Sequence, residues 1–373
     1  MERARSPSAA RESRAATAAP AGLERTALVL AGGNALGAFE AGACRMLNEK
    51  GVRPEWIVGT SIGAVNGAIL AGNPVERRSE ALRRFWSDAA LPGQRLPGQI
   101  QAMLFGSPAV FHPNYRGMIS NEPDAVGLYD LSPLQRSLRN HVDFELLNRG
   151  DLRLSIVATD LESGEEVLFD SRADRIGPEH IMASCALLPE FRPVEIGGRL
   201  LGDGGLVANL PLDVARREPE EGRACIAIDL FDGEGRPSTT LAEATARRQE
   251  LMFASQSRWF LEAYRREDEV RRRLRALVDL LPDELRDRPE AKAALSEAYR
   301  PAMPLIRLAW RPGYEIGLRP FDYSERAVAV RWTAGERTAA EALRAFKEGG
   351  DARGENATIQ VVRGDGRSRL AAE

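Results

Sequence analysis

The chain has 373 residues, of which 28% are charged, and its formal net charge is -3. A balance of this kind gives no indication of nucleic-acid binding, which needs a basic surface. The three cysteines, Cys44, Cys185 and Cys225, are widely spaced and form neither a metal-ligand pattern nor an even disulfide set. No apolar run approaches the roughly 20 residues that span a bilayer. We therefore expect a protein of a reducing compartment, with the cytoplasm as its location.

Residues 1–25 are rich in Ala, Arg, Ser and Pro and lack the apolar core of a secretory signal peptide. Three acidic residues, Glu2, Glu12 and Glu24, also count against an organelle-targeting segment. Such a composition cannot bury enough apolar surface to order itself. The sequence therefore predicts a disordered leader.

The first strand is predicted at residues 26–31, whose continuous apolar run is typical of a buried parallel strand. It leads into Gly32-Gly33-Asn34-Ala35-Leu36-Gly37, and a helix is predicted over residues 38–50. A strand, a Gly-rich turn and a helix can cradle an anion, either in a dinucleotide site or in an oxyanion hole. The dinucleotide alternative is weaker, because Asn34 occupies its second glycine position and the next strand leads to Ser61.

Gly59-Thr60-Ser61-Ile62-Gly63 lies between a predicted buried strand and a helix of small residues over 64–71. A Ser between two glycines at a strand-to-helix turn is typical of a nucleophile elbow. The glycines allow a sharp turn, and the helix N-terminus favours developing negative charge. Ser61 is therefore a candidate nucleophile, although a turn without chemistry also fits this pattern.

Residues 91–130 mix Pro, Gly and apolar side chains without a period, and they follow a predicted amphipathic helix over residues 75–88. Irregular segments of this length are uncommon in compact domains and often act as lids or binding loops. Two interpretations stay open, a lipid-facing lid and a loop packed over the core. Short helices are predicted over residues 131–148.

Strands predicted at residues 152–160 and 166–170 are followed by a helix that begins at Pro178. A hairpin around Gly197-Gly198 then delivers Asp203-Gly204-Gly205, and a buried strand is predicted at residues 224–230. This succession of strands and helices favours an α/β fold.

The composition changes after about residue 232. A charged helix is predicted over residues 240–281, and its alternating charges are typical of a solvated face, with a basic membrane-surface patch as the alternative. A strand at 304–310 and a helix at 324–346 follow. Residues 349–373 are rich in Gly and Arg and are predicted to be poorly ordered.

A nucleophilic serine needs a base, and a histidine oriented by an acid is the usual one. The order serine, acid, histidine is met by Asp160 or Asp170 followed by His180. However, His180 lies at the start of a predicted helix, where a surface or capping role is commoner. His112 and His141 lie in a loop and near a helix end, which are positions typical of solvated histidines.

Asp203 offers a different base, because it follows a strand and has glycines on both sides. A carboxylate at this position could accept the serine proton directly, without a histidine. A turn-forming aspartate is the structural alternative.

Taken together, the glycine-rich turn at 32–37, the elbow at 59–63 and Asp203-Gly204-Gly205 resemble, in this order, the patatin-like phospholipase family. The resemblance covers about residues 26–230 and includes Asn209-x-Pro211 after the aspartate. It implies a three-layer α/β/α domain over residues 26–232 with a mixed, mostly parallel central sheet. The Arg331-Trp332-x-Ala334-Gly335 stretch looks like the C-terminal extension of a bacterial subgroup, here a mainly helical extension over residues 233–348.

The resemblance also implies the roles of individual residues. Ser61 would be the nucleophile and Asp203 the general base, and backbone N–H groups around Gly32, Gly33 and Asn34 would form the oxyanion hole. The motif-supporting glycines would be Gly37, Gly59, Gly63, Gly204 and Gly205. Neither a metal nor another cofactor is implied. Two positions depart from the family pattern: Asn34 replaces the third glycine, and Leu36 replaces a common Arg or Lys.

The resemblance implies a serine lipid acyl hydrolase that cleaves carboxylic ester bonds of phospholipids or neutral lipids, with peripheral membrane contact and no nucleic-acid partner. Two alternatives stay open, a non-catalytic lipid-binding or scaffolding protein of the same fold and a soluble carboxylesterase. The lipid head group, the acyl position and the oligomeric state are not predicted.

Overall fold

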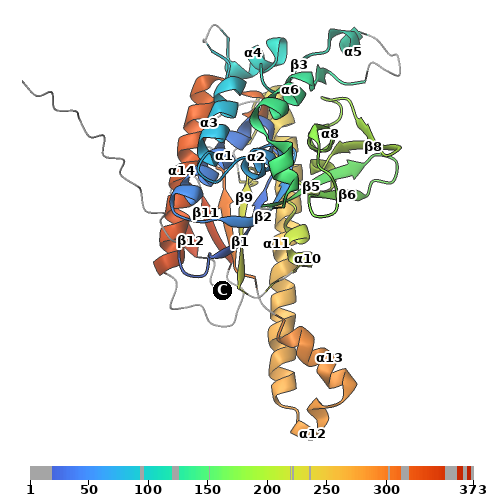
Figure 1. Cartoon of the computed structure of the whole chain (residues 1–373), viewed down its shortest axis with the longest axis vertical. Coiled ribbons are helices and arrows are strands. Elements are labelled where there is room, and N and C mark those ends of the chain that lie inside the picture. The colour runs from blue at the N-terminus through green and yellow to red at the C-terminus, as the bar shows by residue number, and fades with distance from the viewer. Residues whose placement is uncertain are drawn as a thin grey trace, which may run out of the picture.

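The computed structural model describes residues 19–92, 96–119, 126–150, 152–218, 220, 222–234, 237–300, 303–311, 319–348, 359–363 and 368–370. Most of the predicted leader lies outside these residues. Within them, ten strands form one sheet in the order β12-β11-β10-β9-β1-β2-β5-β8-β7, with β6 also paired to β5 (Figure 1). The strands are β1 Arg25–Leu30, β2 Pro54–Thr60, β5 Arg153–Asp160, β6 Glu166–Asp170, β7 Val194–Ile196, β8 Arg199–Asp203, β9 Arg223–Asp229, β10 Leu305–Ala309, β11 Ile359–Arg363 and β12 Ser368–Leu370.

The sheet is mixed and mostly parallel, as the sequence predicts. Strands β11, β10, β9, β1, β2 and β5 pair in parallel, and the antiparallel pairs lie toward its two edges. All residues of β5, β9 and β10 are buried, because helices cover both faces of the sheet. This double cover explains why these strands are mostly apolar and do not alternate between apolar and polar residues.

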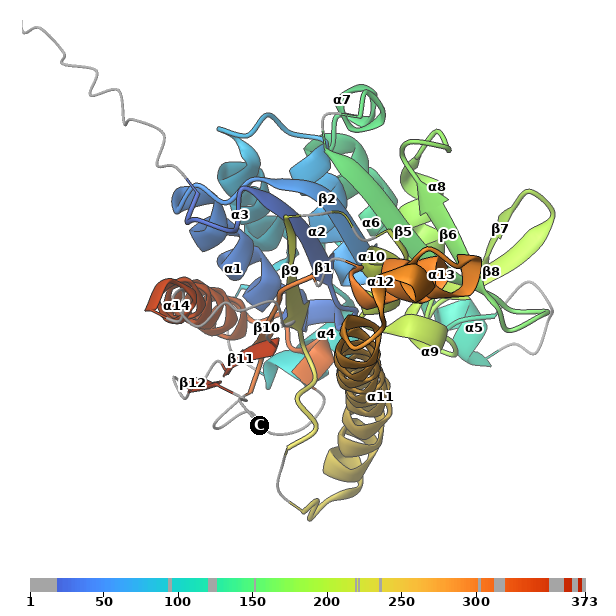
Figure 2. The same cartoon turned by 90° about the horizontal axis from the view of Figure 1, so that it is seen from below.

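Helices α1, α2 and α14 lie on one face of the sheet, and α9, α10 and the N-terminal half of α11 lie on the other, which makes the three-layer arrangement (Figure 2). The helices of the N-terminal half are α1 Gly37–Glu49, α2 Ile62–Ala71, α3 Arg78–Ala89, α4 Gly98–Phe105, α5 Tyr115–Ile119, α6 Ser132–His141, α7 Phe144–Asn148 and α8 Pro178–Ser184. Those that follow are α9 Gly205–Ala208, α10 Leu212–Arg217, α11 Leu241–Asp279, α12 Asp283–Arg286, α13 Pro289–Ala298 and α14 Glu325–Glu348.

The region after residue 232 is mainly helical, as predicted, but it also extends the sheet. Strand β10 pairs in parallel with β9, so the sheet continues across the position where the sequence indicates a division. Helix α14 crosses α1 in close contact, since a Cβ atom on Gly335 would lie 2.0 Å from the Phe39 carbonyl oxygen. This part of the C-terminal region therefore shares one core with the N-terminal part.

Two short strands fall in the predicted poorly ordered tail. Strand β11 pairs with β10, and β12 pairs with β11, at the edge of the sheet. Over these two strands the structure departs from the prediction, and β-branched residue types in the run Ile359-Gln360-Val361-Val362 favour a strand there. The rest of residues 349–373 lies outside the described part of the chain.

The long helix α11 begins at a capping box, in which the Thr240 hydroxyl accepts from the Glu243 N–H at 3.2 Å and the Glu243 carboxylate accepts from the Thr240 N–H. Its first half packs on the core, whereas its second half projects beyond the sheet together with α12 and α13 (Figure 1). None of the helices in the described residues is long and apolar enough to cross a membrane.

The segment predicted to be irregular contains two short helices, α4 and α5, and a two-stranded ribbon formed by β3 His112–Pro113 and β4 Tyr129–Asp130. The expectation of an irregular segment is wrong for these elements, since the segment consists of pieces too short to show a sequence period. Val110 and Phe111 are buried in the core, whereas Leu104 and Phe105 on α4 are 50% and 66% exposed. One part of the segment thus packs inward and another faces solvent.

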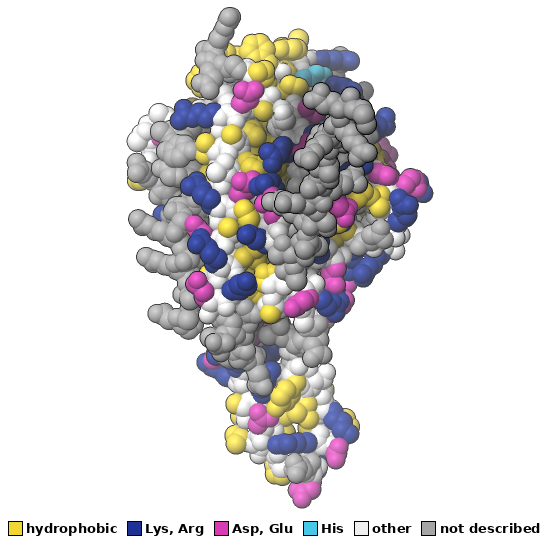
Figure 3. All heavy atoms as spheres, turned by 60° about the vertical axis from the view of Figure 1, so that its left-hand side comes forward, with side chains coloured by type: hydrophobic (Ala, Val, Ile, Leu, Met, Phe, Trp, Pro, Cys, Tyr) yellow, Lys and Arg dark blue, Asp and Glu magenta, His cyan; other side chains and the backbone are white. Residues whose placement is uncertain are grey.

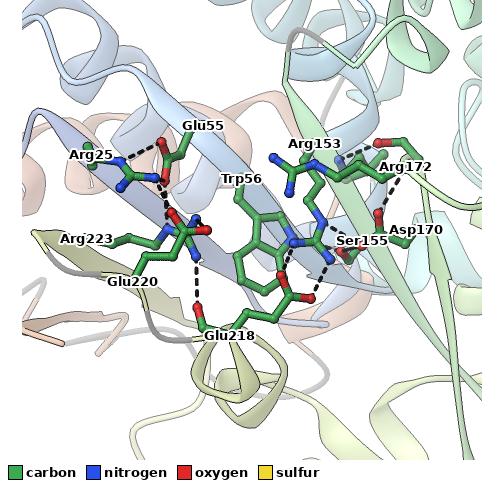
Figure 4. Close-up of polar contacts among 12 residues, drawn as sticks. Arg25, Glu55, Trp56, Arg153, Ser155, Asp170, Arg172, Glu218, Glu220 and Arg223 are labelled. Carbon is green, nitrogen blue, oxygen red and sulfur yellow. Dashed lines mark hydrogen bonds and ion pairs between the residues drawn. The ribbon is translucent and has the colours of Figure 1, made fainter. Parts of the chain in front are cut away.

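At the amino ends of the central strands, a network of ion pairs surrounds the buried ring of Trp56 (Figure 4). The Arg153 guanidinium lies 4.2 Å from the ring centroid, and the Arg223 guanidinium lies 5.4 Å from it. Arg153 also pairs with Asp170 at 2.8 Å and with Glu218 at 2.5 Å. This network fastens β2, β5 and β9 to one another at the end of the sheet opposite Ser61.

Candidate active site

Ser61 lies at the sharp turn between β2 and α2. Its backbone has φ 54° and ψ -122°, a conformation that is strained for a residue with a side chain. A Cβ atom on Gly63 would lie 2.4 Å from the Leu30 carbonyl oxygen, and one on Gly59 would lie 2.6 Å from Gly63. Both glycines are therefore required for the close approach of the turn to its surroundings.

The backbone N–H of Ser61 is held by a neighbouring side chain. It donates to the Ser184 hydroxyl at 2.8 Å, and Ser184 in turn donates to the Val157 carbonyl oxygen at 2.6 Å. The strained turn is thus tied to α8 and β5. This N–H is already used, so it is not a free donor for a substrate.

Asp203 is at the end of β8, next to the elbow. Its carboxylate accepts from the Gly205 N–H at 2.6 Å, and it lies close enough to the Ser61 side chain for Ser61 to lower the pKa of the carboxyl. The Asp203 side chain is almost completely buried, and this burial raises the pKa of Asp203 to about 7, while Ser61 and the Gly205 N–H lower it and the charge of Glu190 raises it. A carboxyl with this pKa can exchange a proton near neutral pH.

The glycine-rich turn continues β1 and begins a short 3-10 helix, η1 Asn34–Leu36. Of the three positions predicted to supply oxyanion donors, Gly32 has its N–H already bound, since it donates to the Asn209 carbonyl oxygen at 2.9 Å. Gly32 instead permits close packing, because a Cβ atom there would lie 2.5 Å from Asn209 Oδ1. In the described part of the chain, the N–H groups of Gly33 and Asn34 have no protein acceptor.

Ser61, Asp203, Gly33 and Asn34 line one pocket. Most of its other walls are apolar: Ile62, Val65, Val110, Leu131, Leu134, Leu187, Phe191, Phe231, Phe253, Pro320 and Phe321. Glu190, whose pKa burial raises, also contributes to the lining. An apolar cleft with a few converging polar groups is the usual form of a small-molecule site.

The residues of the alternative histidine triad lie in other environments. His180 Nδ1 accepts from the Gly177 N–H at 2.9 Å and caps the start of α8. Asp170 is bound by Arg153 and Ser155, and Asp160 accepts backbone N–H groups of its own turn. Among the described residues that line the pocket there is no histidine.

The remaining two histidines lie against other acidic side chains. His141 contacts Asp88 at 3.0 Å, and His112 lies 3.6 Å from Asp130. The described residues also contain no group of three His, Cys, Asp or Glu side chains placed to bind a metal ion.

The C-terminal region contributes contacts that the sequence did not reveal. Gln256 on α11 accepts from the Asn209 N–H at 2.8 Å and donates to the Gly205 carbonyl oxygen at 3.1 Å. Arg331 on α14 donates to the Ala35 carbonyl oxygen at 3.2 Å, and Tyr323 donates to Asn34 Oδ1. The sequence motif around Arg331 indicates the C-terminal extension of the family, whereas no sequence pattern near Gln256 or Tyr323 indicates a contact with the site.

A family model described as patatin-like phospholipase matches residues 28–216, and a second, described as patatin phospholipase, matches residues 251–351. An uncharacterised protein of Bacillus subtilis is 26% identical over 229 residues, which are 58% of this chain and 75% of that protein. The human patatin-like phospholipase domain-containing protein 6 is 30% identical over 207 residues, which are 55% of this chain but 13% of that protein.

An uncharacterised NTE family protein of Mycobacterium tuberculosis is 26% identical over 190 residues, 50% of this chain and 44% of its own length. Among solved structures, VipD from Legionella pneumophila aligns with a TM-score of 0.40 and 13% identity, over 90% of this chain and 71% of that one. The first family match spans about half of the chain and contains the glycine-rich turn, Ser61 and Asp203. The chain therefore belongs to the patatin-like phospholipase family.

Proposed function

We propose that the protein hydrolyses carboxylic ester bonds of lipids, with Ser61 as nucleophile and Asp203 as general base. One observation carries this proposal: a serine on a strained elbow lines the same pocket as a buried carboxyl whose pKa is about 7 and is close enough to lower that pKa. Family membership agrees with a lipid substrate. No metal is needed, because the two side chains supply both the nucleophile and the base.

In the acylation step, Ser61 Oγ attacks the ester carbonyl carbon while its proton passes to Asp203. The carbonyl oxygen becomes negative, and the N–H groups of Gly33 and Asn34 can donate to it. The tetrahedral intermediate then expels the alcohol, which takes the proton from Asp203, and an acyl-serine remains. Water attacks this ester in the same way, with Asp203 again accepting a proton, and the acid leaves as Ser61 is restored.

Two features favour a lipid over a short soluble ester. The walls of the pocket are mostly apolar, and the helices α4 and α5 carry exposed apolar side chains, among them Phe105, Tyr115 and Ile119, which are 66%, 67% and 88% exposed. Residues 97–111 contain no charged residue. Figure 3 shows hydrophobic side chains gathered at the end of the molecule that carries α4. Such a surface suits peripheral contact with a membrane.

Labelling with a fluorophosphonate probe, followed by mapping of the modified residue, tests the proposed dyad. We expect the label on Ser61 and a fall in labelling rate of about 100-fold or more in Asp203→Asn, because the base is lost. A folded protein that takes no label would favour the lipid-binding alternative. Loss of labelling in His180→Ala would favour a histidine base instead.

The pH profile gives a second test of the base. Asp203 must be ionised to accept the proton, so kcat/KM should rise about tenfold per pH unit up to its pKa of about 7 and then level off. The measurement is ester hydrolysis between pH 5 and 9, with Glu190, which also lines the pocket, replaced by Gln as a control. A profile that is flat across pH 7 would contradict the assignment of Asp203.

The substrate class needs its own measurement. Hydrolysis of a phospholipid should accelerate when the lipid passes from monomers to mixed micelles if the exposed surface of α4 contacts an interface. A Phe105→Ser variant should lose most of this acceleration and keep its rate on monomers. A wild type with no acceleration and a preference for short esters would favour a soluble carboxylesterase.

A further inference from the structure

The candidate oxyanion site has fewer free backbone donors than its sequence suggests. The Gly32 N–H is bound to Asn209, and the Ser61 N–H is bound to Ser184. This leaves the N–H groups of Gly33 and Asn34 in the described part of the chain. The position of Asn34 is also unusual, because it holds a side chain at φ 53°, where glycine is favoured. Because the residue here is Asn34 and not glycine, its side chain adds a polar group to the pocket.

The carboxamide of Asn34 has two different surroundings. Its Oδ1 accepts the hydroxyl proton of Tyr323. No protein acceptor lies within hydrogen-bonding distance of its Nδ2 in the described residues, and this nitrogen is not one of the buried polar atoms that lack a partner. Asn34 lines the pocket together with Ser61, and its NH2 group is the part of the carboxamide that Tyr323 does not occupy.

The packing of Tyr323 fixes the orientation of the Asn34 carboxamide. Its side chain is completely buried, and its ring stacks on Trp86 at a centroid distance of 6.3 Å and an angle of 16°. A buried tyrosine donates its only hydroxyl proton to an available acceptor, which here is Asn34 Oδ1. The amide oxygen is therefore turned toward Tyr323, and the NH2 group is turned the other way.

Arg331 joins the segment of Tyr323 to the glycine-rich turn. Its guanidinium, which is fully buried, donates to the Ala35 carbonyl oxygen at 3.2 Å and to the Asp322 carbonyl oxygen at 2.8 Å. These acceptors are the direct neighbours of Asn34 and of Tyr323 in the chain. The C-terminal helix α14 thus sets the distance between the tyrosine hydroxyl and the asparagine amide.

We propose that the Asn34 side chain is a catalytic hydrogen-bond donor of the oxyanion hole and that Tyr323, from the C-terminal region, is the positioning residue that orients it. The proposal rests on the proposed function of Ser61. When Ser61 Oγ adds to the ester carbonyl, negative charge develops on the carbonyl oxygen, and Asn34 Nδ2–H donates to it alongside the backbone N–H groups. No proton leaves Asn34, because the proton of Ser61 goes to Asp203.

The test is the hydrolysis of p-nitrophenyl butyrate by Asn34→Gly. Glycine adopts φ 53° without strain, so the backbone donors stay and only the side-chain donor is removed. We expect kcat to fall about 100-fold, the size found for loss of one oxyanion donor, and KM to change less than about threefold. An Asn34→Gly variant that keeps the wild-type kcat would overturn the proposal.

Tyr323→Phe tests the positioning role. It should lower kcat about tenfold with little change in KM, because the amide is no longer held, and it should have no further effect when added to Asn34→Gly. Additive losses in the double variant would mean that Tyr323 acts only on the fold and would overturn its role. The matched control is Tyr264→Phe, which removes another buried hydroxyl, bound to the Met303 carbonyl oxygen at 2.5 Å, and should leave kcat unchanged.

One variant separates this inference from the proposed function. Ser61→Ala should abolish hydrolysis. If Ser61→Ala still hydrolyses the ester, the proposed function fails and this inference fails with it. If Ser61→Ala is inactive while Asn34→Gly matches wild type, only the role of Asn34 is refuted.

Discussion

The two ends of the central sheet differ in how their polar groups are satisfied. At the carboxyl end, Ser61 has a strained backbone, Asp203 is buried with its pKa raised to about 7, and two backbone N–H groups of the described residues have no protein acceptor. At the amino end, each of the two arginines Arg153 and Arg223 forms ion pairs with carboxylates and also lies against the ring of Trp56 (Figure 4). The first end keeps unsatisfied groups that a substrate could use.

This difference has an energetic consequence. Strained backbone and buried carboxylates persist only where the surrounding structure overdetermines them. Here the surroundings include Ser184, which holds the elbow, and Gln256, which holds the turn after Asp203. We therefore expect that substitutions at the carboxyl end change activity and often increase stability, whereas substitutions at the amino end lower stability and leave activity unchanged.

The largest effect should come from Ser61→Gly. Hydrolysis should fall at least about 10⁴-fold, because the nucleophile is lost. The free energy of unfolding should rise by about 1 kcal/mol, because the relief of a strain of about 1–3 kcal/mol is only partly offset by the greater entropy of unfolded glycine. Ester hydrolysis and urea denaturation measure the two changes. A destabilised Ser61→Gly would mean that the elbow is not a site of strain.

The next largest effect should be the loss of stability in Arg153→Met at the opposite end. Asp170 would lose its cationic partner while remaining buried, which should lower the free energy of unfolding by about 2–3 kcal/mol. The turnover rate should stay within about twofold of wild type. Arg217→Met is the matched control, since its ion pairs with Glu166 and Asp213 are exposed and should contribute less than about 1 kcal/mol. Equal losses of stability in Arg153→Met and Arg217→Met would mean that the buried ion pair contributes no more than the exposed ones.

An effect of comparable size, but dependent on pH, is expected from Asp203→Asn. The pKa of Asp203 is higher in the folded protein, about 7, than its ordinary value of 3.8. The folded state therefore binds the proton more tightly, and the wild type loses stability from this group as pH rises from about 4 to 7. Asparagine has no proton to lose, so the variant should gain about 2–4 kcal/mol relative to wild type between pH 4 and pH 8.

Urea denaturation at the two pH values measures this difference, and other titrating groups cancel in the comparison of variant with wild type. Glu190 is the acidic group whose charge also acts on Asp203, so Glu190→Gln should move the transition to lower pH. A stability difference that does not change with pH would show that Asp203 has an ordinary pKa in the folded protein.

The positions of the central strands follow from local patterns, but the role of the C-terminal region does not. The mostly apolar sequences of β1, β5 and β9 indicate strands covered on both faces, and the glycine pair around Ser61 indicates a tight turn. Residues within about ten positions of each other determine these features. The sequence therefore predicts them well.

Contacts between distant segments carry no such signal. Tyr323 lies 289 positions from Asn34, and Gln256 lies 47 from Asn209. No local pattern distinguishes a tyrosine that will donate to Asn34 from one that packs elsewhere. For the same reason the sequence did not show that the Gly32 N–H is taken by the Asn209 carbonyl oxygen. These contacts depend on the tertiary fold that places α11 and α14 beside the turn.

The smallest expected effect is that of His180→Ala, which tests the alternative to the dyad. His180 Nδ1 accepts from the Gly177 N–H, and its ring packs edge-on against Phe169 at 4.6 Å between centroids. We expect a loss of about 1 kcal/mol in the free energy of unfolding, because a helix cap and an aromatic contact are removed. The turnover rate should stay within about twofold of wild type, measured on the same ester as for Ser61→Gly. If turnover instead slowed by about 100-fold or more with intact stability, as loss of a general base would slow it, a histidine would take part in the reaction. The contrast between the two ends of the sheet would then fail, since the buried carboxyl would no longer be the sole base.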